Sequence, residues 1–196
     1  GYVSMYNQTQ DAIGYLAAVK QLADKLGVSA AFDQQTMKRI ETNIANKDSM
    51  LVLVGIAYRA SDKYLKTNKR TEVSSLILAG GWIESMHFSI SAYAVKQSNE
   101  VKYSIAEQKQ ALGSIIKLLA SNTAPEAIEL GKQLSDLAKI YEGIQFKYSF
   151  VEPTTDSIKK MTYINSTNEV IVSKEQIDQI TAKISEIRTK ITNVQS

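Results

Sequence analysis

The strongest constraint on the fold is a row of β-branched residues close to the C-terminal end of the sequence. Steps of three and four residues separate its members, which are Ile177, Ile180, Ile184, Ile187, Ile191 and Val194. Side chains at this spacing lie on one face of an α-helix. Ser173 precedes the row and Gln176 follows three residues later, a spacing typical of a capping box. The sequence therefore predicts a final helix whose isoleucine seam packs within its own chain in preference to a second copy.

The same helical spacing recurs over most of the chain. It predicts helices over residues 9–26, 49–65, 73–95, 99–119 and 125–144, and a further helix that ends at residue 44 and is capped by Ser29 or Asp33. Gly27 suits the end of the helix over residues 9–26, and Pro125 suits the beginning of the helix over residues 125–144. A chain of 196 residues that is 44% hydrophobic can bury an adequate core without disulfides. We therefore expect an all-α, single-domain helical bundle of about seven helices over residues 1–196.

Residues 145–172 depart from the helical pattern. Phe146, Tyr148 and Phe150 alternate with polar residues, and residues 170–172 are β-branched. A period of two is typical of a β-strand, and Pro153 begins a segment typical of a turn. We expect a short extended arm or a small hairpin before the last helix.

The stretch 73–95 is the most apolar of the chain and contains one formally charged residue, Glu84. Its length would span a bilayer, but a charged residue at the bilayer centre costs about 3 kcal/mol. His87 and several serines also lie within it. We therefore expect a central helix that other helices surround on all sides.

Five residues of this stretch are the candidate ligand-binding residues: Gly80, Gly81, Trp82, Glu84 and His87. Each glycine costs about 1 kcal/mol relative to alanine inside a helix, so a close neighbouring helix, a kink or a ligand contact should offset it. An aromatic wall beside one charged group is a common recognition arrangement. The competing interpretation is that the tryptophan is a core residue whose indole N–H has one partner.

A carboxylate in so apolar a helix must be paired or protonated, and this requirement gives Glu84 a structural role. Arg59 and Arg188 stand on predicted helices that could neighbour it, and tyrosines such as Tyr141 could donate hydrogen bonds. We therefore hypothesise a structural ion pair of Glu84 with Arg59 or Arg188.

Composition narrows the chemistry further. The chain has no cysteine, and its one histidine excludes sites that need two histidines from one chain. The net charge is only +3, without the basic stripe typical of nucleic-acid-binding proteins. We assign no catalytic residue and expect no metal, no cofactor and no nucleic-acid partner. An enzyme is less expected than a binding or structural protein.

Three runs carry a resemblance to a known group of proteins. Residues 64–70 (YLKTNKR), 79–86 (AGGWIESM) and 184–188 (ISEIR) resemble segments of uncharacterised exported or lipid-anchored helical proteins of Bacteroidetes-type bacteria. The resemblance implies a periplasmic or outer-membrane-associated protein, made with a signal segment and often a lipid anchor upstream of Gly1. That anchor would be its only association with the membrane. The resemblance implies no catalytic residues.

These observations lead to two functional hypotheses. The first is a non-enzymatic cell-envelope protein, monomeric or homodimeric, that acts as a scaffold or an interaction module. The alternative is a small-ligand binding module with a pocket near Trp82, Glu84 and His87.

Overall fold

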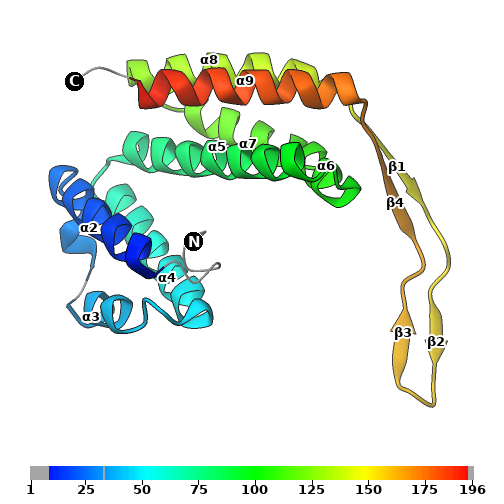
Figure 1. Cartoon of the computed structure of the whole chain (residues 1–196), viewed down its shortest axis with the longest axis horizontal. Helices are drawn as coiled ribbons and strands as arrows, with labels where there is room; N and C mark the ends of the chain where they lie inside the picture. The colour runs from blue at the N-terminus through cyan, green and yellow to red at the C-terminus, as the bar shows by residue number, and fades with distance from the viewer. Residues whose placement is uncertain (1–8, 33, 194–196) are drawn as a thin grey trace. The chain divides into compact units, whose positions relative to one another are not determined.

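The structure, a computed structural model, describes residues 9–32 and 34–193. Within these ranges the elements are helices, apart from one β-ribbon that precedes the last helix (Figure 1). The predicted fold class is confirmed, and residues 145–172 take the form of a hairpin. The chain forms two compact units, which comprise residues 1–74 and residues 75–196. That the chain behaves as a single domain stays a prediction.

Unit 1 is built from α2 (Thr9–Lys25), the 3-10 helix η1 (Ser29–Ala31), α3 (Gln34–Thr42), α4 (Lys47–Thr67) and the first turn of α5 (Thr71–Val95). The chain reverses after α2 at Gly27, whose φ of 66° lies in the left-handed region that glycine tolerates. The amide of Val28 then donates to the Ala23 carbonyl at 2.8 Å, which completes the predicted helix end.

The core of unit 1 consists of two small clusters of buried side chains. The first contains Ala23, Val28 and Leu65, with Leu26, Phe32, Tyr64 and Val73 packed against it. The second contains Ile40, Met50 and Leu53, with Leu16, Met37 and Ala57 packed against it. Neither cluster approaches the size of the core in unit 2.

Unit 2 contains the rest of α5, α6 (Asn99–Ala106), α7 (Lys109–Ala120), α8 (Pro125–Glu142), four strands and α9 (Lys174–Thr192). The helix predicted over residues 99–119 is divided at Glu107 and Gln108, although no glycine or proline marks the break. The Gln108 side chain accepts a hydrogen bond from the Trp82 indole and donates to the Ser104 carbonyl. The break between α6 and α7 thus coincides with a contact between Gln108 and Trp82 of α5. Helix propensity depends on neighbouring residues in the sequence and does not indicate such a contact.

The isoleucine seam lies in the core of unit 2. Four members of the seam are at most 1% exposed and pack in the core with residues of α8: Ile177, Ile180, Ile184 and Ile187. The next member, Ile191, is 48% exposed. Burial of each such side chain contributes about 1.5–3 kcal/mol. The prediction that the seam packs within its own chain is confirmed for these four residues, and Val194 lies outside the described residues.

The prediction that other helices surround α5 on all sides is wrong. One stripe of α5 is buried, comprising Ala79, Ile83, Met86 and Ile90, but the side with Ile77, Leu78 and Phe88 is 37–44% exposed. The serine hydroxyls of α5 donate to carbonyls of their own helix, as Ser85 does to the Gly81 carbonyl at 2.8 Å. Their hydrogen bonds therefore require no polar group from another helix. Among the described residues, no helix has the length and hydropathy to cross a membrane.

The arm, residues 145–172, is a two-stranded ribbon with two ladders. β1 (Gln145–Ser149) pairs antiparallel with β4 (Thr167–Ile171), and β2 (Thr154–Asp156) pairs antiparallel with β3 (Met161–Tyr163). Between the ladders, the Ser166 hydroxyl accepts from the Val151 amide and donates to its carbonyl, both at 3.1 Å. Side-chain hydrogen bonds thus continue the pairing where the backbone ladder is interrupted.

Candidate interaction surface

The five predicted ligand-binding residues lie along α5, and two of them, Trp82 and Glu84, form side-chain hydrogen bonds with other elements of unit 2. A Cβ added at Gly80 or Gly81 would meet nothing within 4 Å, so close approach of another helix does not account for these glycines. The Trp82 Nε1 donates to the Gln108 Oε1 at 3.1 Å, while the ring packs half-buried against the core of unit 2. This tryptophan therefore has the single partner expected of a core residue.

Glu84 lies in a bidentate ion pair. The Nε and Nη2 atoms of Arg188 donate to its two carboxylate oxygens at 2.7 and 3.1 Å. These hydrogen bonds from Arg188 hold the pKa of the Glu84 carboxyl below its ordinary value. Arg59, the other proposed partner, lies on α4 in unit 1, and the Tyr141 hydroxyl donates to the Ile105 carbonyl at 3.0 Å instead.

His87 contacts Phe88, with ring centroids 6.2 Å apart. Among the described residues, no group of three or more histidine or acidic side chains is placed to hold a metal ion. A shallow groove of about 570 Å³ lies between α7 and α8, and two further cavities lie in unit 1, all lined by residues outside α5. That a ligand binds at Gly80, Gly81, Trp82, Glu84 and His87 stays a prediction.

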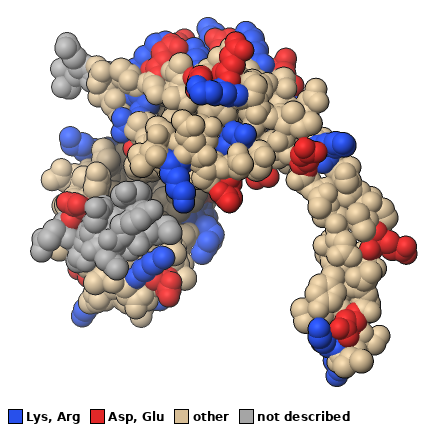
Figure 2. Space-filling model, turned by 45° about the vertical axis from the view of Figure 1, so that its right-hand side comes forward, with Lys and Arg blue, Asp and Glu red and all other residues tan. Residues whose placement is uncertain are grey.

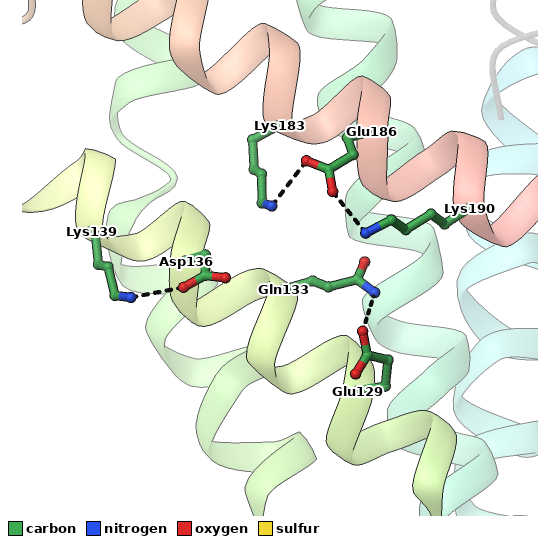
Figure 3. A network of polar contacts seen from close by, with 7 residues as sticks. All are labelled: Glu129, Gln133, Asp136, Lys139, Lys183, Glu186 and Lys190. Carbon is green, nitrogen blue, oxygen red and sulfur yellow. Dashed lines mark hydrogen bonds and ion pairs between the residues drawn. The ribbon is translucent and has the colours of Figure 1, made fainter.

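A network of charged side chains covers the surface between α8 and α9 (Figure 3). Glu186 bonds to Lys183 and Lys190, and these hydrogen bonds lower the pKa of its carboxyl. On α8, Asp136 pairs with Lys139, and the Gln133 amide donates to Glu129. Each of these bonds joins two residues of the same helix, and the three lysines balance the three carboxylates, so the network presents no net charge to a ligand.

The arm has a different surface, because large apolar side chains project from it into solvent. Nine of them are 41–95% exposed: Phe146, Tyr148, Phe150, Val151, Ile158, Met161, Tyr163, Ile164 and Ile171. Figure 2 shows the ribbon as mainly uncharged surface, with charged side chains at its tip and a group of acidic atoms partway along it. Within β1 to β4 only Val170 is buried, in the core of unit 2.

Register assigns the side chains of the first ladder to two faces, because directly paired residues of antiparallel strands share a face. Phe146 pairs with Val170 and Tyr148 pairs with Asn168, which places both aromatic rings on one face. The opposite face carries Lys147, paired with Glu169 at the centre of the ladder. The ribbon thus has an aromatic face and a face with a central pair of opposite charges.

The arm also leaves backbone groups without strand partners. In the described residues each ladder has only two strands, so each strand has one free edge. Free edges can accept a further strand, and a two-stranded hairpin alone is only marginally stable in water. Both properties favour coverage of the arm by another molecule.

Sequence reasoning identified the arm as extended but did not assign it a binding role. The alternation of Phe146, Tyr148 and Phe150 implies one buried face, as in an ordinary half-buried strand. The signal that could have identified the surface is the density of large apolar residues in a segment that has no helix of its own to bury them. No family model, curated protein or solved structure matches this chain.

Proposed function

We propose that this chain is a non-enzymatic interaction module of the cell envelope that binds a partner protein through the aromatic face and free edges of the arm. The observation that carries the proposal is the concentration of nine exposed large apolar side chains on residues 145–172. Apolar surface of this density is typical of binding sites on soluble proteins. The envelope location rests on the resemblance of residues 64–70, 79–86 and 184–188 to exported proteins.

The chemistry of the arm favours a protein over other macromolecules. Three lysines and three acidic residues give it a net charge of zero, 3 − 3 = 0, so it has no long-range attraction for phosphate groups or an anionic bilayer. Its exposed aromatic residues, among them Tyr148 and Phe150, belong to the classes enriched at protein interfaces. The free edges add backbone hydrogen bonds that an extended partner segment can complete.

The charges at the centre of the first ladder favour a partner other than a second copy. If β1 paired antiparallel with its own copy about Lys147, two lysines would lie opposite each other. The same pairing of β4 about Glu169 would oppose two glutamates. Like charges directly opposite destabilise antiparallel strands, so centred self-pairing is disfavoured.

A shortened arm tests the proposal. Ser149 and Thr167 are directly paired, so an Asn-Gly turn can replace residues 150–166 and close the β1–β4 hairpin. The photoreactive residue p-benzoylphenylalanine replaces Tyr148 in the full-length chain and in the shortened chain, both expressed in the source cells. A second full-length chain carries it at Tyr103, which is 37% exposed on α6, as the control position.

We expect a discrete adduct between position 148 of the full-length chain and a different protein, and none from position 103. The adduct should be much weaker in the shortened chain, which keeps the β1–β4 ladder but lacks six of the nine exposed apolar side chains. Circular dichroism should show equal helix content in the full-length and shortened chains. An adduct of twice the chain's own mass would contradict the proposal and show that the arm binds a second copy of this chain. Sedimentation with phosphatidylethanolamine–phosphatidylglycerol vesicles that disappears on shortening, without a protein adduct, would instead assign the arm to a lipid surface. The absence of any adduct would reject the proposal.

A further inference from the structure

Unit 1 contains a cavity of about 290 Å³ where α2, η1, α3 and α4 meet, and we refer to it as the hollow. Its apolar lining includes Leu16, Ala23, Phe32, Met37, Ile40 and Ala57. These residues come from both buried clusters of the unit, so the hollow lies where the two clusters adjoin. A small domain usually has one contiguous core, whereas this unit has an opening within its core.

Unfilled apolar volume destabilises a fold, because the lining atoms lose van der Waals partners on one side. The hollow is nevertheless bordered by two small residues, Ala23 on α2 and Ala57 on α4. Larger apolar side chains at these positions would fill it. Occupation by an apolar molecule would supply the missing contacts without any change in the sequence.

The polar side chains at the hollow are already satisfied by partners within the unit. Lys20 forms an ion pair with Glu41, and the Ser29 hydroxyl donates to the Asp24 carboxylate. A charged ligand would lose hydration on entering and would gain no free counter-charge. An uncharged ligand meets no such penalty. The hollow should therefore bind uncharged molecules in preference to ions.

The size of the hollow limits the ligand further. An apolar cavity of about 150 Å³ accommodates benzene, and the hollow is about twice that volume. Val19, which lines it, is 55% exposed, so the hollow has a side open to solvent. We infer that it binds an uncharged, mainly apolar molecule of about ten to twelve non-hydrogen atoms, such as a bicyclic aromatic compound.

Calorimetry on the full chain tests this inference with 2-naphthol as the uncharged probe and 2-naphthoate as its charged counterpart. The variant Ala57→Leu fills the hollow from α4, and Val19→Phe covers its open side without entering the buried clusters. Ala18→Leu, on an exposed position of α2, adds the same side chain as Ala57→Leu outside the hollow and serves as the matched control. Circular dichroism establishes that each variant is folded.

We expect 2-naphthol to bind with one-to-one stoichiometry and to raise the melting temperature by about 3–6 °C at ten times its dissociation constant. 2-Naphthoate should bind at least tenfold more weakly. Ala57→Leu and Val19→Phe should each weaken 2-naphthol binding at least tenfold, and Ala18→Leu should leave it within twofold. If Ala57→Leu does not fold, Val19→Phe decides alone. Absence of binding, equal affinity for the two probes, or binding that both hollow variants leave unchanged would overturn the inference. These results do not depend on the arm.

Discussion

Arg188 of α9 donates two parallel hydrogen bonds to the carboxylate of Glu84 in α5, at 2.7 and 3.1 Å, across a sequence separation of 104 residues. The guanidinium fork matches the two oxygens of a carboxylate, which makes this the strongest geometry for an ion pair. The side chains are nevertheless 35% and 40% exposed, and solvent screens their attraction. The pair therefore adds a modest stabilising link between α5 and α9.

A double-mutant cycle with Glu84→Gln and Arg188→Met should give a coupling free energy of about 0.5–1 kcal/mol at pH 7, measured by urea unfolding. The pKa of Glu84 is lower in the folded protein than its ordinary value of 4.5, so this stability is present above about pH 4.5. It is lost as the pH falls through the folded-state pKa.

The exposed pair Lys174 and Asp178 on α9, in which the side chains are 74% and 60% exposed, provides the control cycle. Its coupling should be smaller than that of Glu84 and Arg188, because solvent screens the attraction between two largely exposed side chains. A coupling between Glu84 and Arg188 at pH 7 no larger than that of this control pair would show that the fork geometry contributes nothing.

Sequence reasoning predicted most of the helices because their apolar spacing is local information. The seam from Ile177 to Ile187 and the end of α2 at Gly27 both follow from rules that concern a few neighbouring residues. The division between α6 and α7 was missed, since it coincides with a contact of Gln108 with Trp82, 26 residues away. The enclosure of α5 was wrong for a related reason, because high hydropathy does not report how many neighbours a helix has.

The candidate surface was less predictable than the fold. The alternation in β1 indicated a strand, but whether its aromatic face is buried depends on elements elsewhere in the chain. The sequence alone supports the hypothesis that Glu84 pairs with an arginine, because a carboxylate in an apolar helix needs a counter-charge. The choice between Arg59 and Arg188 depends on which helices pack together, and only the fold supplies that information. The hollow has no sequence signature, since Ala23 and Ala57 are ordinary helix residues.

Tyr141 is fully buried, and its hydroxyl donates to the Ile105 carbonyl at 3.0 Å. Tyr141→Phe should lower the free energy of unfolding by about 0.5–1.5 kcal/mol, because the carbonyl loses this partner. Burial raises the pKa of Tyr141 above its ordinary value of 10.0, so stability should fall as the pH rises above 10. This fall should be shallower in Tyr141→Phe than in the wild type.

Tyr148→Phe is the control for that substitution, because Tyr148 is 65% exposed on the arm. It should change the unfolding free energy by less than about 0.5 kcal/mol. Equal effects of the two substitutions would mean that burial of the Tyr141 hydroxyl has no energetic consequence.

Lys69, immediately after α4, has a φ of 59°, in the left-handed region. The amide of Arg70 donates to the Leu65 carbonyl at 2.8 Å, so Lys69 occupies the position that glycine commonly takes at a helix end. Lys69→Gly should therefore raise the unfolding free energy by about 0.5–1 kcal/mol, through relief of backbone strain. Lys63→Gly, at an exposed position inside α4, should lower it by about 1 kcal/mol. Loss of stability in both variants, measured by urea unfolding, would contradict the strain at Lys69.

Gly143, at the end of α8, leaves room for the side chain of Gln176, which belongs to the capping box at the beginning of α9. A Cβ at this position would lie 2.8 Å from the Nε2 of Gln176, whose Oε1 accepts a hydrogen bond from the Ser173 amide in the capping box of α9. The φ of Gly143 is −74°, which alanine adopts without strain, so the only obstacle to alanine is this amide.

Gly143→Ala should lower the unfolding free energy by about 0.5–1 kcal/mol in the wild type, because displacement of the Gln176 amide weakens the cap. In a Gln176→Ala background the obstacle is gone, and the same substitution should raise the unfolding free energy by about 0.4–1 kcal/mol through the reduced entropy of the unfolded chain. Urea unfolding of the four proteins measures this reversal of sign. Equal stabilisation in both backgrounds would show that the amide moves aside without cost, and that the capping box does not depend on glycine at the end of α8.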